Sequence, residues 1–171
     1  RLLIDGKHPT RVRGRVGLVM QDPESQVVLA KVGDDVAFGC ENMGLPRQEI
    51  WPRVHRALDA VGLRVPMDQP TGALSGGQKQ RLAIAAALAM QGSTADSAGP
   101  GILCLDEPTA NLDPAGIVDV RDAIGRVVAD RTTTLLVVEH RVDVWADLVD
   151  RIIVLGPEGL LADGPVAQVL A

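Results

Sequence analysis

The sequence of 171 residues contains few aromatic residues and no cluster of basic ones. Its aromatic side chains are Phe38, Trp51 and Trp145, and tyrosine is absent. Platforms for stacked nucleic-acid bases are therefore not expected. Lys and Arg are scattered along a chain whose net charge is -5, so no basic patch attracts a polyanion. These absences argue against DNA or RNA as the main ligand.

Cysteines and long apolar runs are also scarce. Cys40 and Cys104 match neither a Cys-x-x-Cys pair nor a metal-ligand spacing, and Cys104, inside an apolar run, is expected to be a small buried hydrophobe. The longest apolar run, residues 82–90, is far shorter than the ~20 residues that cross a bilayer. The start of the sequence does not resemble a signal peptide. We expect one soluble domain in a reducing cytosol, able to dock on a membrane-embedded partner.

Four short apolar runs predict buried strands of a parallel sheet. They cover residues 16–20, 102–105, 134–138 and 152–155. The first three are followed by polar residues, which are Gln21, Asp106 and the pair Glu139-His140. Because the carboxyl ends of parallel strands line the ligand crevice of an open sheet, we expect these polar groups to share one site.

The stretches between the apolar runs predict helices. Apolar residues recur at helical spacing over residues 50–61. Ser75 and Gln78 form a capping-box pattern ahead of residues 82–90, and Asp113-Pro114 is a typical helix start. The remaining expectations are a short helix at Trp145 and Leu148, a surface loop over residues 91–101, and a hairpin turn at 156–159 leading into a short strand at 160–162.

Two adjacent acids, Asp106 and Glu107, follow the apolar run 102–105. A carboxylate in this position is suited to hold Mg²⁺, and a second one beside it can orient a water molecule for attack on a phosphate. A solvated turn or a helix cap would explain two acids alone. It would not explain the continuation Pro-Thr-Ala-Asn-Leu-Asp over residues 108–113.

Ser75, Gly76 and Gly77 stand at a predicted helix start, where free N–H groups and the helix dipole favour an anion. They belong to the string Leu-Ser-Gly-Gly-Gln, residues 74–78, which Lys-Gln-Arg follows. A capped helix would explain Ser-x-x-Gln by itself. The whole string is a much more specific signal.

Taken together, these segments resemble the ABC ATPase family over nearly the whole chain. The resemblance implies an α/β fold of the P-loop NTPase (RecA-like) class, with a mostly parallel sheet, an inserted α-helical subdomain and a truncated N-terminal side. It implies one partial ATPase domain over residues 1–171. Residues 1–21 and 102–171 would form the α/β core, and residues 22–101 the helical subdomain, signature helix and loop.

The resemblance also implies ATP and Mg²⁺ as cofactors and gives roles to single residues. Asp106 and Gln21 are similar to the metal-site residues, and Glu107, His140 and Gln21 to the catalytic set. The signature motif and the D-loop acid, which act on ATP bound to the opposite subunit in this family, are matched by Ser75, Gly76, Gly77, Gln78 and Asp113. His8 and His55 lack any such context.

Within the family, residues 16–26, 34–39 and 42–46 are similar to the energy-coupling-factor type, including the cobalt and nickel importer ATPases. That type implies a second ATPase subunit in a head-to-tail dimer, a transmembrane coupling subunit and a substrate-binding membrane subunit. No nucleic acid is implied. The expected place is peripheral, at the cytoplasmic face of the cell membrane.

One family element is missing, because the sequence contains no Gly-x-x-x-x-Gly-Lys-Ser/Thr phosphate loop. At its one Gly-Lys pair, Gly6-Lys7, His8 replaces the hydroxyl residue and Arg1 replaces the leading glycine. Such a loop supplies the N–H cradle and the lysine that hold the phosphates. We therefore expect the chain alone not to turn over ATP. We also expect its sheet to lack a strand, which would leave strand edges unpaired and apolar surface exposed.

Two alternatives remain at this point. The chain could be a non-catalytic companion that lends residues 75–78 and Asp113 to a partner's ATP site. Alternatively, it could belong to the DNA-repair ATPases that share these motifs. That class carries a long coiled coil or zinc modules, for which the ~50 residues between Gln21 and Leu74 leave no room.

Overall fold

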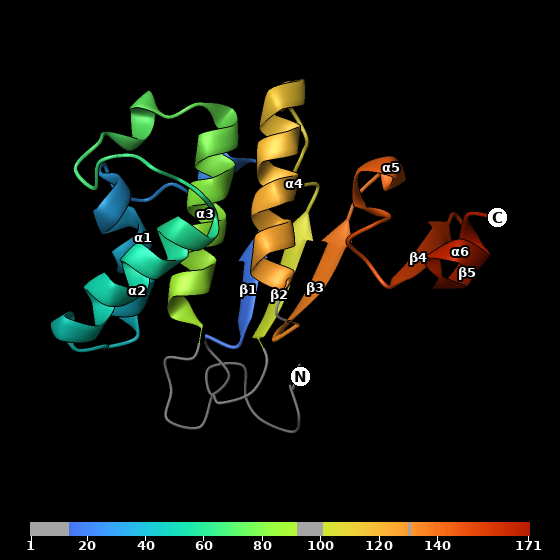
Figure 1. Ribbon diagram of the computed structural model, residues 1–171, viewed down its shortest axis with the longest axis horizontal. Helices are drawn as coiled ribbons and strands as arrows, with labels where there is room; N and C mark the ends of the chain where they lie inside the picture. The colour runs from blue at the N-terminus through green and yellow to red at the C-terminus, as the bar shows by residue number, and fades with distance from the viewer. Residues whose placement is uncertain (1–13, 92–100, 130) are drawn as a thin grey trace. The chain divides into compact units, whose positions relative to one another are not determined.

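The computed structural model describes residues 14–91, 101–129 and 131–171 (Figure 1). It falls into two compact units, Arg1–Val138 and Glu139–Ala171. The Gly6-Lys7 pair and most of the predicted loop over residues 91–101 lie outside the described residues.

The first unit contains a parallel sheet of three strands. These are β1 (Val16–Val19), β2 (Gly101–Asp106) and β3 (Thr133–Val138), in the order β1-β2-β3. The register aligns Val19 with Leu105, and Asp106 with Val138. The first three predicted strands are therefore confirmed as neighbours that run in one direction.

Among the described residues, four helices and two 3₁₀ turns belong to the same unit. They are η2 (Pro23–Gln26), α1 (Val32–Asn42), α2 (Arg47–Ala60), η3 (Thr71–Ala73), α3 (Gly76–Met90) and α4 (Pro114–Val128). Helix α3 packs against β1, α4 packs against β3, and α1 and α2 lie beside α3 (Figure 1). Across the described ranges, no helix has both the length and the apolar character to span a bilayer.

Within the described part of the first unit, helices pack on one face of the three-stranded sheet. Leu103 and Leu105 are fully buried on the α3 side, where Gly17 lies close to Ala87 of α3. On the other face, Leu18 and Leu136 are 61% and 53% exposed, and Cys104 is half-buried. The expectation that these strands and Cys104 are fully buried is therefore wrong for the described residues, because α3 and α4 pack on a single face.

The second unit consists of α5 (Val142–Trp145), β4 (Arg151–Gly156), β5 (Gly159–Pro165) and α6 (Val166–Val169). Strands β4 and β5 pair antiparallel. The expected hairpin is thus confirmed, whereas the prediction that residues 152–155 join the parallel sheet is wrong. Pro157 and Glu158 alone separate β4 from β5, so the chain folds straight back on itself.

Candidate functional site

Polar side chains gather at the carboxyl edge of the three-stranded sheet. Gln21 follows β1, Asp106 ends β2, and Glu107 comes directly after it. The Gln21 Nε2 atom donates a hydrogen bond of 2.8 Å to Glu107 Oε2. The register of Val19 with Leu105 brings the two strand ends level. Two residues that are 86 positions apart in sequence therefore meet where the sheet ends.

Glu107 has an unusual backbone conformation, with φ at 43°. Residues other than glycine adopt this left-handed region rarely and at an energetic cost. Two hydrogen bonds hold it: the Glu107 N–H donates to the Val138 carbonyl (2.8 Å), and the Glu107 carbonyl accepts from the Ala110 N–H (3.0 Å). A strained residue held in this way is often part of a functional site.

The segment after β1, residues 20–26, is closed by its own hydrogen bonds. The Gln26 side chain accepts from the Met20 N–H (3.0 Å) and donates to the Met20 carbonyl (3.2 Å). Asp22 caps η2 by accepting from the Glu24 N–H (3.0 Å), and the Asp22 carbonyl accepts from the Ser25 hydroxyl (2.7 Å). Gln21 therefore sits in a small rigid loop, which the sequence pattern did not predict.

Ser75 and Gln78 form the predicted capping box at the start of α3. The Ser75 hydroxyl accepts from the Gln78 N–H (3.3 Å), and the Gln78 side chain accepts from the Ser75 N–H (2.9 Å). The first N–H groups of a helix have no acceptor within the helix, and Gly76 is exposed. The helix start thus still offers N–H groups to an anion.

Asp113 caps α4, since its Oδ1 atom accepts from the Gly116 N–H (3.0 Å). The starts of α3 and α4 also approach each other closely, because a Cβ built on Gly77 would lie 3.1 Å from the Gly116 Cα. A Cβ on Gly76 would lie 3.3 Å from the Leu112 side chain. The Gly-Gly pair and the segment ending in Asp113 are therefore neighbours within this chain, a contact that the sequence did not reveal.

His140 is exposed and belongs to the second unit, two residues after the end of β3. Its backbone N–H donates to Glu139 Oε2 at 3.0 Å. This places the histidine at the start of the segment before α5. Its expected contact with a phosphate stays a prediction.

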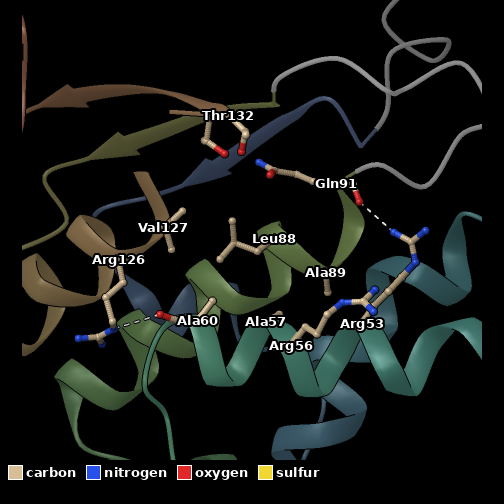
Figure 2. A pocket seen from close by; sticks show the side chains of 11 residues that line it. Arg53, Arg56, Ala57, Ala60, Leu88, Ala89, Gln91, Arg126, Val127 and Thr132 are labelled. Carbon is tan, nitrogen blue, oxygen red and sulfur yellow. Dashed lines mark hydrogen bonds between the residues drawn. The ribbon is translucent and has the colours of Figure 1, made fainter. Parts of the chain in front are cut away.

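A cavity of about 320 Å³ opens between α2, α3, α4 and the start of β3 (Figure 2). Two arginines that line the cavity form hydrogen bonds with backbone carbonyls. Arg53 donates to the Gln91 carbonyl (2.9 Å), and Arg126 donates to the Ala60 carbonyl (3.2 Å). Its wall includes Thr133, the first residue of β3, so the cavity lies at the amino end of that strand. None of the predicted site residues lines it.

Comparison with known proteins places the chain in a family. The family model described as ABC transporter matches residues 1–110. The chain belongs to the ABC transporter family. Within it, the chain is of the energy-coupling-factor type. It is 41% identical to the energy-coupling factor transporter ATP-binding protein EcfA1 of Symbiobacterium thermophilum, over all of this chain and 58% of that protein.

Other ABC transporter relatives show the same pattern of partial coverage. A putative ABC transporter ATP-binding protein of Methanosarcina acetivorans is 41% identical over 99% of this chain and 27% of its own length. The solved structure of cbiO1 from Clostridium perfringens, described as part of the complex cbiONQ, matches with a TM-score of 0.83 and 34% identity. It covers 98% of this chain and 66% of cbiO1. The α/β fold with a parallel sheet is therefore that of an ABC ATPase.

The edge residues of this ABC protein are of the chemical kinds that can hold Mg²⁺. The Asp106 side chain is exposed at the end of β2, and the Gln21 amide nitrogen is engaged by Glu107, which leaves the Gln21 carbonyl oxygen as a ligand atom. Carboxylate and amide oxygens are hard ligands that Mg²⁺ accepts. The cradle for the phosphates themselves is not supplied by any phosphate-loop motif in this sequence.

Proposed function

We propose that this chain forms part of an ATP-binding and ATP-hydrolysing subunit of an energy-coupling-factor importer. The observation that carries the proposal is the 2.8 Å hydrogen bond between Gln21 and Glu107, beside Asp106 at the carboxyl edge of the sheet. It supports a site where a carboxylate and an amide act on one water molecule and one metal ion. The family membership supports ATP as the nucleotide.

In this proposal, oxygen atoms of Asp106 and Gln21 would hold Mg²⁺, and Glu107 would orient the attacking water. Bound Mg²⁺ would neutralise charge on the phosphate oxygens, as in other phosphoryl-transfer enzymes. His140 would contact the terminal phosphate. The groups offered to ATP on a second subunit would be Ser75, Gly76, Gly77, Gln78 and Asp113.

The wider assignments belong to the same proposal. Residues 22–101 would form a helical subdomain with the signature helix and loop, inserted in one ATPase domain, and the subunit would lie at the cytoplasmic face of the membrane. It would pair head-to-tail with a second ATPase subunit and contact a transmembrane coupling subunit. A separate membrane subunit would select the cargo, a metal ion or a vitamin. EcfA1 is a transporter ATP-binding protein and cbiO1 is part of the ABC transporter complex cbiONQ, which supports placing this chain in a transporter complex.

A chimera tests the proposal. The part of Symbiobacterium thermophilum EcfA1 that aligns with this chain is replaced by this chain, and ATP hydrolysis is measured in the assembled transporter. The chimera should hydrolyse ATP. Glu107→Gln should lower kcat by about a hundredfold or more while ATP still binds, because only the water-orienting carboxylate is lost.

The matched control is Glu49→Gln, which changes a half-exposed acid on α2 that pairs with Arg53. It should leave kcat unchanged. An active chimera in which Glu107→Gln hydrolyses ATP at the unmodified rate would disprove the role given to Glu107. A chimera that folds and assembles but shows no hydrolysis would favour the non-catalytic companion instead.

A further inference from the structure

We propose that Lys79 is a positioning residue, whose ion pair with Glu24 fastens the loop that carries Gln21 to the signature helix α3. The proposal deepens the function proposed above and rests on it. The function proposed above assigns no role to Lys79. The pair joins two segments that are 55 positions apart in sequence.

Lys79 is unusual because it is a lysine in the protein interior. Its side chain is 10% exposed, and its Nζ atom contacts Glu24 Oε1, whose own side chain is 67% exposed. A buried ammonium group is costly unless a carboxylate and hydrogen bonds compensate it. Loss of the ion pair therefore affects the two residues differently. The buried Lys79 ammonium group would lose its compensating charge, whereas water can solvate the exposed Glu24 carboxylate.

The loop transmits this contact because it is closed on itself. Glu24 lies in η2, whose cap is Asp22, and the Gln26 side chain ties the end of the turn back to Met20. We therefore expect residues 20–26 to shift together when Glu24 is displaced. Gln21 lies in this segment, and its amide reaches Glu107 at 2.8 Å.

The other end of the pair is the start of the signature helix. Lys79 directly follows Gln78, which closes the capping box with Ser75. One ion pair thus connects the start of α3 with the loop that carries Gln21. In the proposed function, the start of α3 faces a second subunit, and the Gln21 amide contacts Glu107. The geometry points to Lys79 as the link that sets the position of Gln21.

Hydrogen exchange on the whole chain tests this link without any nucleotide. The variants are Lys79→Met, Glu24→Gln and the double variant, and Asp122→Asn in the exposed pair with Arg121 is the control. Lys79→Met should raise exchange over residues 20–26 by about fivefold or more and leave α3 unchanged. Glu24→Gln should raise it there and also at the start of α3, because it leaves a buried charge without its partner.

In the double variant, exchange at the start of α3 should return toward the unmodified level, while residues 20–26 stay loose. Unchanged exchange over residues 20–26 in Lys79→Met would overturn the proposal. An equal rise over every helix and strand would overturn it as well, since the pair would then stabilise the fold as a whole. Lys79→Met nearly conserves volume, so a failure of Glu24→Gln to fold does not remove the test.

A kinetic reading in the EcfA1 chimera separates positioning from general stability. Lys79→Met should lower kcat several-fold with the KM for ATP unchanged, since the nucleotide contacts stay and only the Gln21 position is lost. An unchanged kcat would contradict the link to the reaction. Absence of hydrolysis in the unmodified chimera would instead count against the proposed function, while the exchange results would stand alone.

Discussion

Gly77 shows how one residue serves two requirements. It lies in the first turn of α3, where the sequence predicts an anion-binding helix start, and that role stays a prediction. The structure adds a packing requirement, because a Cβ at this position would meet the Gly116 Cα at 3.1 Å. Backbone atoms of two helix starts cannot move aside as a flexible side chain can. The second glycine of the motif is thus also explained by the contact between α3 and α4.

Gly77→Ala should therefore destabilise the chain by about 1–3 kcal/mol, the usual cost of forcing an extra methyl group into a packed contact. Gly72→Ala is the matched control, since nothing lies within 4 Å of a Cβ there and its φ is not positive. Denaturant unfolding followed by circular dichroism measures both. Equal stability of the two variants would show that the close approach has no energetic weight.

Single residues were predictable where a local rule applies. Ser75 and Asp113 were predicted as helix caps because the cap residue and its neighbours are consecutive in sequence. The burial of Lys79 and the φ of Glu107 were not predictable. Both involve contacts with residues far away in the chain, Glu24 and Val138 respectively. The periodicity of apolar residues in a sequence does not predict such long-range contacts.

Among the secondary-structure elements, the β4–β5 hairpin carries the clearest charged contact. Arg151 donates from Nε and Nη2 to the two carboxylate oxygens of Asp163, both at 2.6 Å. The hydrogen bonds from Arg151 lower the pKa of the Asp163 carboxyl below its ordinary value. The same contact raises the pKa of the Arg151 guanidinium. Both groups lie at the surface, so salt will screen the pair.

The pH dependence follows from the direction of the Asp163 shift. A carboxyl whose pKa is lower in the folded hairpin stabilises it above the unfolded pKa, and this stability is lost as pH falls through the folded value. Amide exchange in β4 and β5 should therefore accelerate below about pH 4, after correction for the intrinsic rate. Asp163→Asn should abolish that dependence, and Glu158→Gln in the turn should leave it intact. A dependence that persists in Asp163→Asn would assign it to another group.

Elements with a strong period or cap were predicted, and elements without one were not. Helices α2, α3 and α4 follow from apolar spacing and caps, and all three were found. Helix α1 was missed, because no side chain caps its start and it contains Gly33 and Gly39, although Val32, Val36 and Cys40 are buried at helical spacing. Strand β4 was assigned to the wrong sheet, because an apolar run does not specify its partner.

For the whole molecule, the sequence was sufficient for the fold class and the order of the motifs. Parallel strands, intervening helices and polar residues at strand ends were predicted, and the match to cbiO1 at a TM-score of 0.83 agrees. The sequence predicted exposed apolar surface, but not that the face of the sheet carrying Leu18 and Leu136 would be the exposed one. The covering of a face depends on the other layers of a fold, and the chain spans 58% of EcfA1.

The proposed function requires Gln21, Asp106 and Glu107 to act together on one nucleotide and one metal ion. The most direct measurement is a crystal structure of the EcfA1 chimera carrying Glu107→Gln, grown with ATP and Mg²⁺. In that crystal, Mg²⁺ should lie beside Asp106 and the Gln21 carbonyl oxygen, and His140 should contact the terminal phosphate. Metal and triphosphate bound away from the carboxyl ends of β1 and β2 would contradict it.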